Sequence, residues 1–93
     1  MEKTTLSSNS FIARCKLKKA GYKKISKNVA NDLYNTGKEV VILFQVDNWF
    51  DTTTAKYKPE NPMSFDYYLY ELVYYLADNI LGYYVEKEKK QCC

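Results

Sequence analysis

The feature that most constrains the fold is the run Val-Val-Ile-Leu-Phe-Gln-Val at residues 40–46. β-branched and aromatic residues favour a strand, and a nearly continuous apolar run predicts a strand covered on both faces, or nearly so. A chain of 93 residues has room for one small domain with a thin core. We therefore expect a single domain over residues 1–93, organised around this strand, with residues 1–7 and 87–93 flexible.

Three helices are expected, because serines that can cap a helix start are followed by apolar periodicity and then by a glycine that can end the helix. The expected ranges, with the glycine that ends each, are 8 or 10 to 20 with Gly21, 26 to 36 with Gly37, and 64 to 79 or 81 with Gly82. The inward stripe of the third helix is expected to contain Phe65, Leu69, Leu72, Val73, Leu76 and Ile80, flanked by Tyr68 and Tyr75.

Short extended segments are expected at residues 22–25, 52–57 and 83–85, the last beside the central strand. The predicted fold class is therefore α+β, with three helices packed on a small two- to three-stranded, mainly antiparallel sheet. This sheet is expected to form around residues 39–47 and 82–86.

The chain contains no histidine, which removes the usual general base at neutral pH and the commonest metal ligand. Its glycines are isolated, so no phosphate-binding loop is expected. Asp47, Asp51 and Glu60 could approach a hard cation, but their spacing matches no calcium loop. We expect no enzymatic activity, no cofactor and no bound metal.

Three cysteines, Cys15, Cys92 and Cys93, form an odd set and are expected to be free thiols in a reducing compartment. No run is long and apolar enough for a membrane helix, and the N-terminal residues lack the apolar core of a signal peptide. We therefore expect a cytoplasmic protein with no membrane partner.

Charge is distributed unevenly, since residues 1–38 carry a net +7 and residues 39–93 a net −4. The first helix and its exit hold a basic stripe beside Tyr22. Three interpretations of this stripe stay open: a solvated helix face, a contact surface for a nucleic-acid backbone, and a contact surface for an acidic protein. It consists of Arg14, Lys16, Lys18, Lys19, Lys23, Lys24 and Lys27.

The outward side of the third helix is unusually aromatic. Helical spacing places Tyr67, Tyr70 and Tyr74 there, together with Glu71, Ala77 and Asp78. Tyrosine is enriched at protein–protein hot spots, so this side is a candidate partner-binding surface. Alternatively, a neighbouring loop that holds Trp49 and Phe50 covers it.

Trp49 and Phe50 follow the central strand directly, between two aspartates. Such an aromatic pair can anchor a loop in the core or protrude as a binding hot spot. We include both residues among the candidate partner-binding side chains.

The segment ISKNVANDLYNTGKEVVILF, with Tyr68, Leu72, Tyr75 and the closing Leu81-Gly82-Tyr83-Tyr84-Val85, resembles small proteins of bacteriophages and mobile elements of low-GC Gram-positive bacteria. The resemblance spans roughly residues 20 to 86. It implies a small non-enzymatic protein, and many of that class block host defence enzymes such as CRISPR effectors by covering a working surface.

The leading functional hypothesis is an anti-CRISPR-like inhibitor in the host cytosol that binds a larger host protein or a protein–nucleic acid complex. The first alternative is a nucleic-acid-binding accessory or regulatory protein that uses the basic first helix. The second is a homodimeric structural module that buries its tyrosines against a second copy; the oligomeric state is left open between monomer and homodimer.

Overall fold

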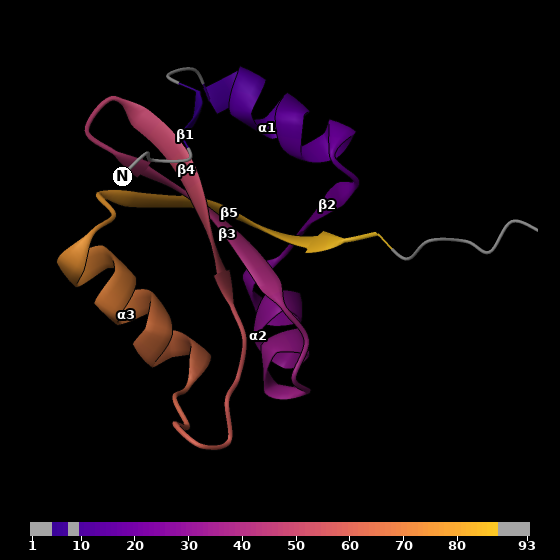
Figure 1. Ribbon diagram of the computed structural model, residues 1–93, viewed down its shortest axis with the longest axis vertical. Coiled ribbons are helices and arrows are strands. Elements are labelled where there is room, and N and C mark those ends of the chain that lie inside the picture. Colours follow the sequence, from indigo (N-terminus) through magenta and orange to yellow (C-terminus); the bar gives the residue numbers. More distant parts are fainter. Residues whose placement is uncertain (1–4, 8–9, 88–93) are drawn as a thin grey trace, which may run out of the picture.

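The computed structural model describes residues 5–7 and 10–87. In chain order, the elements are β1 (Thr5–Ser7), α1 (Ser10–Lys19), β2 (Tyr22–Ile25), α2 (Lys27–Asn35), β3 (Val40–Val46), β4 (Trp49–Ala55), α3 (Phe65–Tyr75) and β5 (Asn79–Glu86), as Figure 1 shows. The described residues thus form an α+β fold with three helices, as expected. Cys92 and Cys93 lie outside the described residues.

The strands form one sheet of five, in the order β1-β4-β3-β5-β2, and every neighbouring pair is antiparallel. The expected two to three strands were too few. The run at residues 40–46 forms the central strand β3, which pairs with β4 from Val40↔Ala55 to Val46↔Trp49. The strand Thr5–Ser7 was not predicted, because its short polar sequence carries no strand periodicity.

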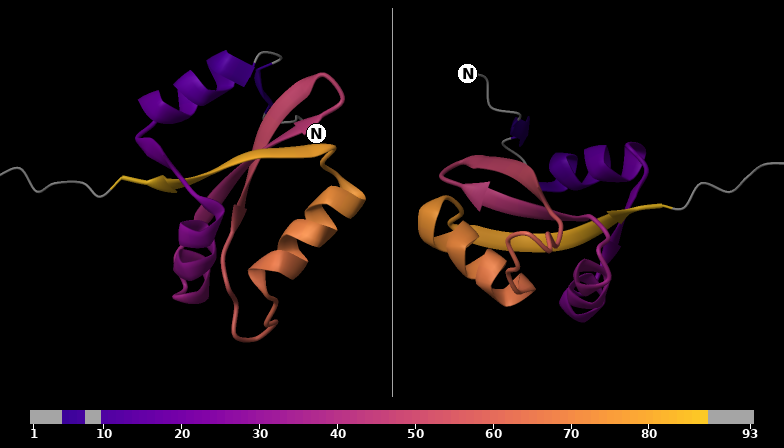
Figure 2. Two further views of the ribbon diagram at one scale, coloured as in Figure 1. Left: turned by 180° about the vertical axis from the view of Figure 1, so that it is seen from behind. Right: turned by 60° about the horizontal axis from the view of Figure 1, so that its bottom comes forward.

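Helices cover both faces of this sheet. Figure 2 shows α1 on one side and α2 with α3 on the other. Side chains alternate along β3 accordingly. Ile42 packs with Tyr34 of α2 and Phe65 of α3, whereas Leu43 packs with Ala13 and Leu17 of α1. Both residues are fully buried, which confirms the prediction that this strand is covered on two faces.

Two of the three helix-stop predictions are confirmed, and so are the capping serines of α2 and α3. Ser26 accepts a hydrogen bond from the Val29 N–H at 3.2 Å, and Ser64 accepts one from the Tyr67 N–H at 3.1 Å. Gly37 follows α2 with a φ of 91°, a left-handed conformation that favours glycine.

The predicted end of the third helix was wrong. The helix stops at Tyr75, and Gly82 lies inside strand β5 rather than at a helix end. The physical reason is tertiary pairing, because the second edge of β3 needs a partner for its backbone N–H and C=O groups. Residues 79–86 supply it, from Gln45↔Asn79 to Val41↔Tyr84.

This earlier stop rearranges the expected inward stripe. Phe65 and Leu69 are buried as predicted, but Val73 and Leu76 are exposed, and Ile80 packs into the core from a strand. Ala77, which was expected on the outward side, is only 2% exposed. The helical angle stops applying after Tyr75, so residues beyond Tyr75 change sides. Val73 keeps its helical position, but it lies in the last turn of α3 and is left exposed there.

The first helix contributes few side chains to the core. Only Ala13 and Leu17 of its described side chains are buried, while the apolar residues Phe11 and Ile12 are exposed. None of the helices that the structure describes has the length and apolar character needed to cross a membrane.

Candidate functional site

The exposed side of α3 carries a connected row of tyrosine rings, formed by Tyr67, Tyr70, Tyr74 and Tyr75, which we call the tyrosine face. The Tyr67 and Tyr70 rings stack with centroids 6.3 Å apart, and the Tyr70 and Tyr74 rings stack at 6.1 Å with only 13° between their planes. Tyr75 then meets Tyr74 edge to face at 4.7 Å. The helical spacing of these residues places consecutive rings within reach of one another.

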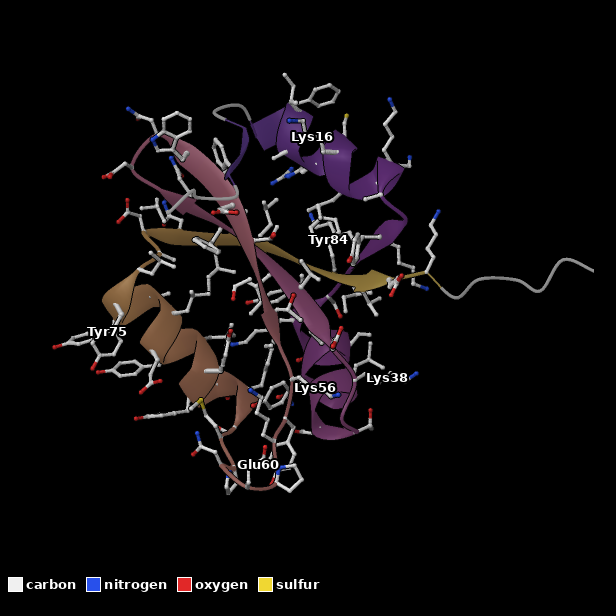
Figure 3. All side chains as sticks on the ribbon, in the orientation of Figure 1. Lys16, Lys38, Lys56, Glu60, Tyr75 and Tyr84 are labelled. Atoms are coloured by element: carbon white, nitrogen blue, oxygen red, sulfur yellow. The ribbon has the colours of Figure 1, made fainter. Side chains whose placement is uncertain are left out.

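All four rings are accessible to solvent. Their exposed fractions are 50% for Tyr67, 64% for Tyr70, 68% for Tyr74 and 75% for Tyr75. Figure 3 shows Tyr75 directed away from the sheet. The prediction that Tyr67, Tyr70 and Tyr74 lie on the outward side is therefore confirmed.

The alternative that a loop holding Trp49 and Phe50 covers these tyrosines is wrong. The two residues begin strand β4 instead of a loop, and Phe50 packs against the cluster on the α1 side of the sheet, the opposite side from α3. Phe50 is therefore half-buried and faces away from the tyrosine face.

Trp49 differs from its neighbour because successive side chains of a strand point to opposite faces. It is 52% exposed and pairs with Val46 on the side of the sheet that carries α3. Of the two aromatic residues after the central strand, the structure thus leaves Trp49 as a surface candidate, while Phe50 serves as an anchor.

Sequence reasoning missed three exposed residues at the end of α3, of which Tyr75 belongs to the tyrosine face. Tyr75, Val73 and Leu76 were assigned to the inward stripe or its flank, but all three are exposed. The sequence Ile-Leu-Gly-Tyr-Tyr-Val at residues 80–85 is typical of a strand. Had this pattern been given more weight, it would have predicted an earlier end of the helix.

Glu71 lies one turn after Tyr67 and influences it directly. A hydrogen bond to the Glu71 side chain is the largest cause of the raised pKa of the Tyr67 hydroxyl, followed by the charge of that carboxylate. Both effects favour the protonated phenol. Glu71 therefore adds negative charge beside Tyr67, at one end of the row.

Asp78, another predicted partner-binding residue, ties the exit of α3 to the β3–β4 turn. Its carboxylate accepts a hydrogen bond from the Asp47 N–H at 2.8 Å, and its own N–H donates to the Gln45 carbonyl at 2.7 Å. Asp47 has a φ of 55°, as a tight hairpin turn requires. Asp78 is exposed, so its charge remains open to solvent three residues after the last ring of the tyrosine face.

The basic residues named from the sequence lie on three elements, not on one stripe. Arg14, Lys16, Lys18 and Lys19 belong to α1, Lys23 and Lys24 to β2, and Lys27 to α2. Lys27 does not belong with the others, because its ammonium group forms an ion pair with Asp66 of α3 at 3.4 Å.

Two open hollows gather most of the others. One, of about 640 Å³, is lined by Ile12, Cys15, Lys16, Lys18, Lys19 and Lys87. The second, of about 390 Å³, is lined by Lys18, Tyr22, Lys23, Lys24 and Lys87. Lys87 belongs to both hollows and was missed from the sequence because it is far from the other lysines along the chain. We call the lysines that line these hollows the basic surface.

Within residues 5–7 and 10–87, no three His, Cys, Asp or Glu side chains gather to hold a metal ion. Cys15 is an exposed free thiol. The absence of an enzymatic activity, a cofactor and a metal stays a prediction.

Comparison of the chain with models of protein families, with curated proteins and with solved structures gave no match. The resemblance to small phage and mobile-element proteins thus stays a prediction drawn from the sequence.

Proposed function

We propose that this protein is a small non-enzymatic binding protein that docks the tyrosine face on a larger protein partner. The observation that carries the proposal is the row of four exposed rings, each in contact with the next. Tyrosine brings a large contact area and a polar tip, and rings already packed against one another lose little freedom on binding.

The biological consequence we propose is inhibition by occlusion in the host cytosol. A domain of 10.9 kDa that covers a working surface needs no reaction of its own. The resemblance to small phage proteins suggests a host defence protein, or its complex with nucleic acid, as the partner.

The test is a quantitative capture experiment with a lysate of low-GC Gram-positive cells. We expect a protein that is retained by the natural chain and lost with the double variant Tyr70→Ala, Tyr74→Ala, and that binds again as a purified component. Because both rings are exposed, the double variant should unfold at nearly the same denaturant concentration as the natural chain.

A matched control is Val29→Ala, which shortens an exposed apolar side chain on α2, away from the tyrosine face. This control should retain the partner fully. Equal capture by the natural chain and the double tyrosine variant would refute the proposed binding surface.

A second candidate function, nucleic-acid binding, is favoured by the basic surface, where two hollows share Lys18 and Lys87. Phosphate contacts by lysines give an affinity that falls steeply with salt. Charge reversal at Lys18, Lys19 and Lys23 should abolish retardation of DNA or RNA at low salt. No retardation by the natural chain would eliminate this candidate.

A further inference from the structure

The tyrosine face lies in the most acidic part of the chain, and this charge bears on what it can bind. Between Lys58 and Lys87 the sequence contains no lysine or arginine. The same stretch holds five carboxylates, Glu60, Asp66, Glu71, Asp78 and Glu86. Among the described residues, the ion pair of this stretch joins Asp66 to Lys27 at the first turn of α3. No such pair neutralises Glu71 or Asp78 within the described part of the chain.

The end of α3 reinforces this negative character. The last turn of a helix presents carbonyl oxygens that carry a partial negative charge, and cations placed there are stabilised. No basic residue occupies the last turn of α3. Tyr74 and Tyr75 lie at this end, and Asp78 follows three residues later.

The rings themselves favour the same ligand chemistry. The face of a tyrosine ring attracts an arginine guanidinium or a lysine ammonium group through its quadrupole. Tyr70 and Tyr74 each leave well over half of their surface open, so a cation can approach them from solvent. Planar guanidinium groups also stack on aromatic rings while reaching a neighbouring carboxylate.

On these grounds we infer that the tyrosine face binds a cationic surface of its protein partner, with arginine or lysine side chains placed over the rings of Tyr70 and Tyr74 and facing Glu71 and Asp78. This inference rests on the proposed function and specifies the partner's chemistry. Nucleic-acid bases also stack on aromatic side chains, but their phosphates would meet carboxylates here. A symmetric dimer through α3 would place its acidic groups near those of the second copy.

The experiment follows the backbone amide resonances of the full chain by nuclear magnetic resonance during titration with three probes. These are a short peptide of alternating arginine and glycine, the matching peptide of glutamate and glycine, and a single-stranded oligothymidine. We expect only the arginine peptide to shift the amides of residues 65–78, and we expect its affinity to fall several-fold as salt is raised.

Two sets of variants separate the rings from the charge. The double variant Tyr70→Leu, Tyr74→Leu keeps apolar area but removes the ring faces. It should lower the affinity for the arginine peptide about 5-fold. Asp78→Asn keeps an oxygen that can accept the hydrogen bond from the Asp47 N–H but removes the negative charge. It should lower the affinity for the arginine peptide about 2-fold. Glu60→Gln, which removes a carboxylate from the loop before α3, is the charge-matched control and should change the affinity least.

Several results would overturn the inference. The first is that the arginine and glutamate peptides bind equally well. The second is that oligothymidine shifts the amide resonances of α3. The third is that sedimentation shows a dimer that dissociates in the leucine variant. A captured partner that needs Tyr70 and Tyr74 but binds equally well at high salt and with Asp78→Asn would overturn this inference alone. Partner capture that does not need the tyrosines would instead overturn the proposed function.

Discussion

The hydroxyl group of Tyr34 on α2 donates a hydrogen bond of 2.7 Å to the backbone carbonyl of Met63, in the segment that leads into α3. The Tyr34 ring also contacts Phe65 at 5.2 Å, in the first turn of α3. Tyr34 is 2% exposed. This one side chain therefore fixes where the helix with the tyrosine face begins relative to the sheet.

Removing this hydroxyl should destabilise the domain. Tyr34→Phe leaves the Met63 carbonyl without its partner, and we expect the free energy of unfolding to fall by about 1–2 kcal/mol. Denaturant unfolding followed by circular dichroism measures this loss. Tyr70→Phe removes a hydroxyl from an exposed ring and is the matched control, with an expected change below about 0.5 kcal/mol. Equal losses for the two variants would contradict the role of the Tyr34 hydroxyl.

Stability should also fall at alkaline pH. Burial raises the pKa values of Tyr34, Tyr83 and Tyr84 above the ordinary 10.0. Below that pH both folded and unfolded chains keep these protons, so the groups do not change the balance. Above it the unfolded chain ionises first, and the free energy of unfolding decreases with rising pH. Denaturant unfolding at a series of pH values checks this, and Tyr34→Phe should show a shallower decrease than the natural chain.

The two-sided burial of β3 predicts that neighbouring residues are equally critical. Ile42→Ala and Leu43→Ala should each cost about 2–5 kcal/mol, because each leaves a cavity on a different face of the sheet. The exposed Val29→Ala serves as the reference, with a much smaller loss. A Leu43→Ala variant as stable as this reference would show that α1 does not cover its face in solution.

Two glycines should respond to alanine in opposite ways. Gly37 has a φ of 91°, where an alanine side chain is strained, so Gly37→Ala should cost about 1 kcal/mol. In Gly82→Ala the added Cβ would lie 3.4 Å from Tyr84 Cε1 and 3.5 Å from Lys24 Cε, which is ordinary contact. Alanine also suits a strand better than glycine does. Thermal unfolding of both variants checks this, and a strongly destabilised Gly82→Ala would argue that the close packing around Gly82 is tighter than these distances indicate.

The charged contact between α2 and α3 should contribute little. Lys27 and Asp66 approach to 3.4 Å, but both side chains are largely exposed. We expect a coupling energy below about 0.5 kcal/mol in a double-mutant cycle, decreasing further with salt. A larger, salt-insensitive coupling would contradict this assignment.

The sequence by itself determined the features that depend on neighbouring residues. The capping serines Ser26 and Ser64, the stop at Gly37 and the strand at residues 40–46 follow from local hydrogen bonds, backbone conformation and apolar content. The outward positions of Tyr67, Tyr70 and Tyr74 follow from helical spacing alone, because all three lie within Phe65–Tyr75, where α3 keeps its regular helical angle.

Tertiary structure decided where α3 ends, and therefore where helical spacing no longer predicts which side chains are exposed. Residues 76–82 are apolar enough to continue a helix, but the open edge of β3 offers backbone partners that a longer helix would leave unpaired. The chain therefore turns at Leu76, which buries Ala77 and leaves Tyr75 in solvent. A second long-range pairing, of β5 with β2, brings Lys87 beside the lysines of α1, since a hydrogen bond joins the Lys87 N–H to the Gly21 carbonyl at 2.8 Å.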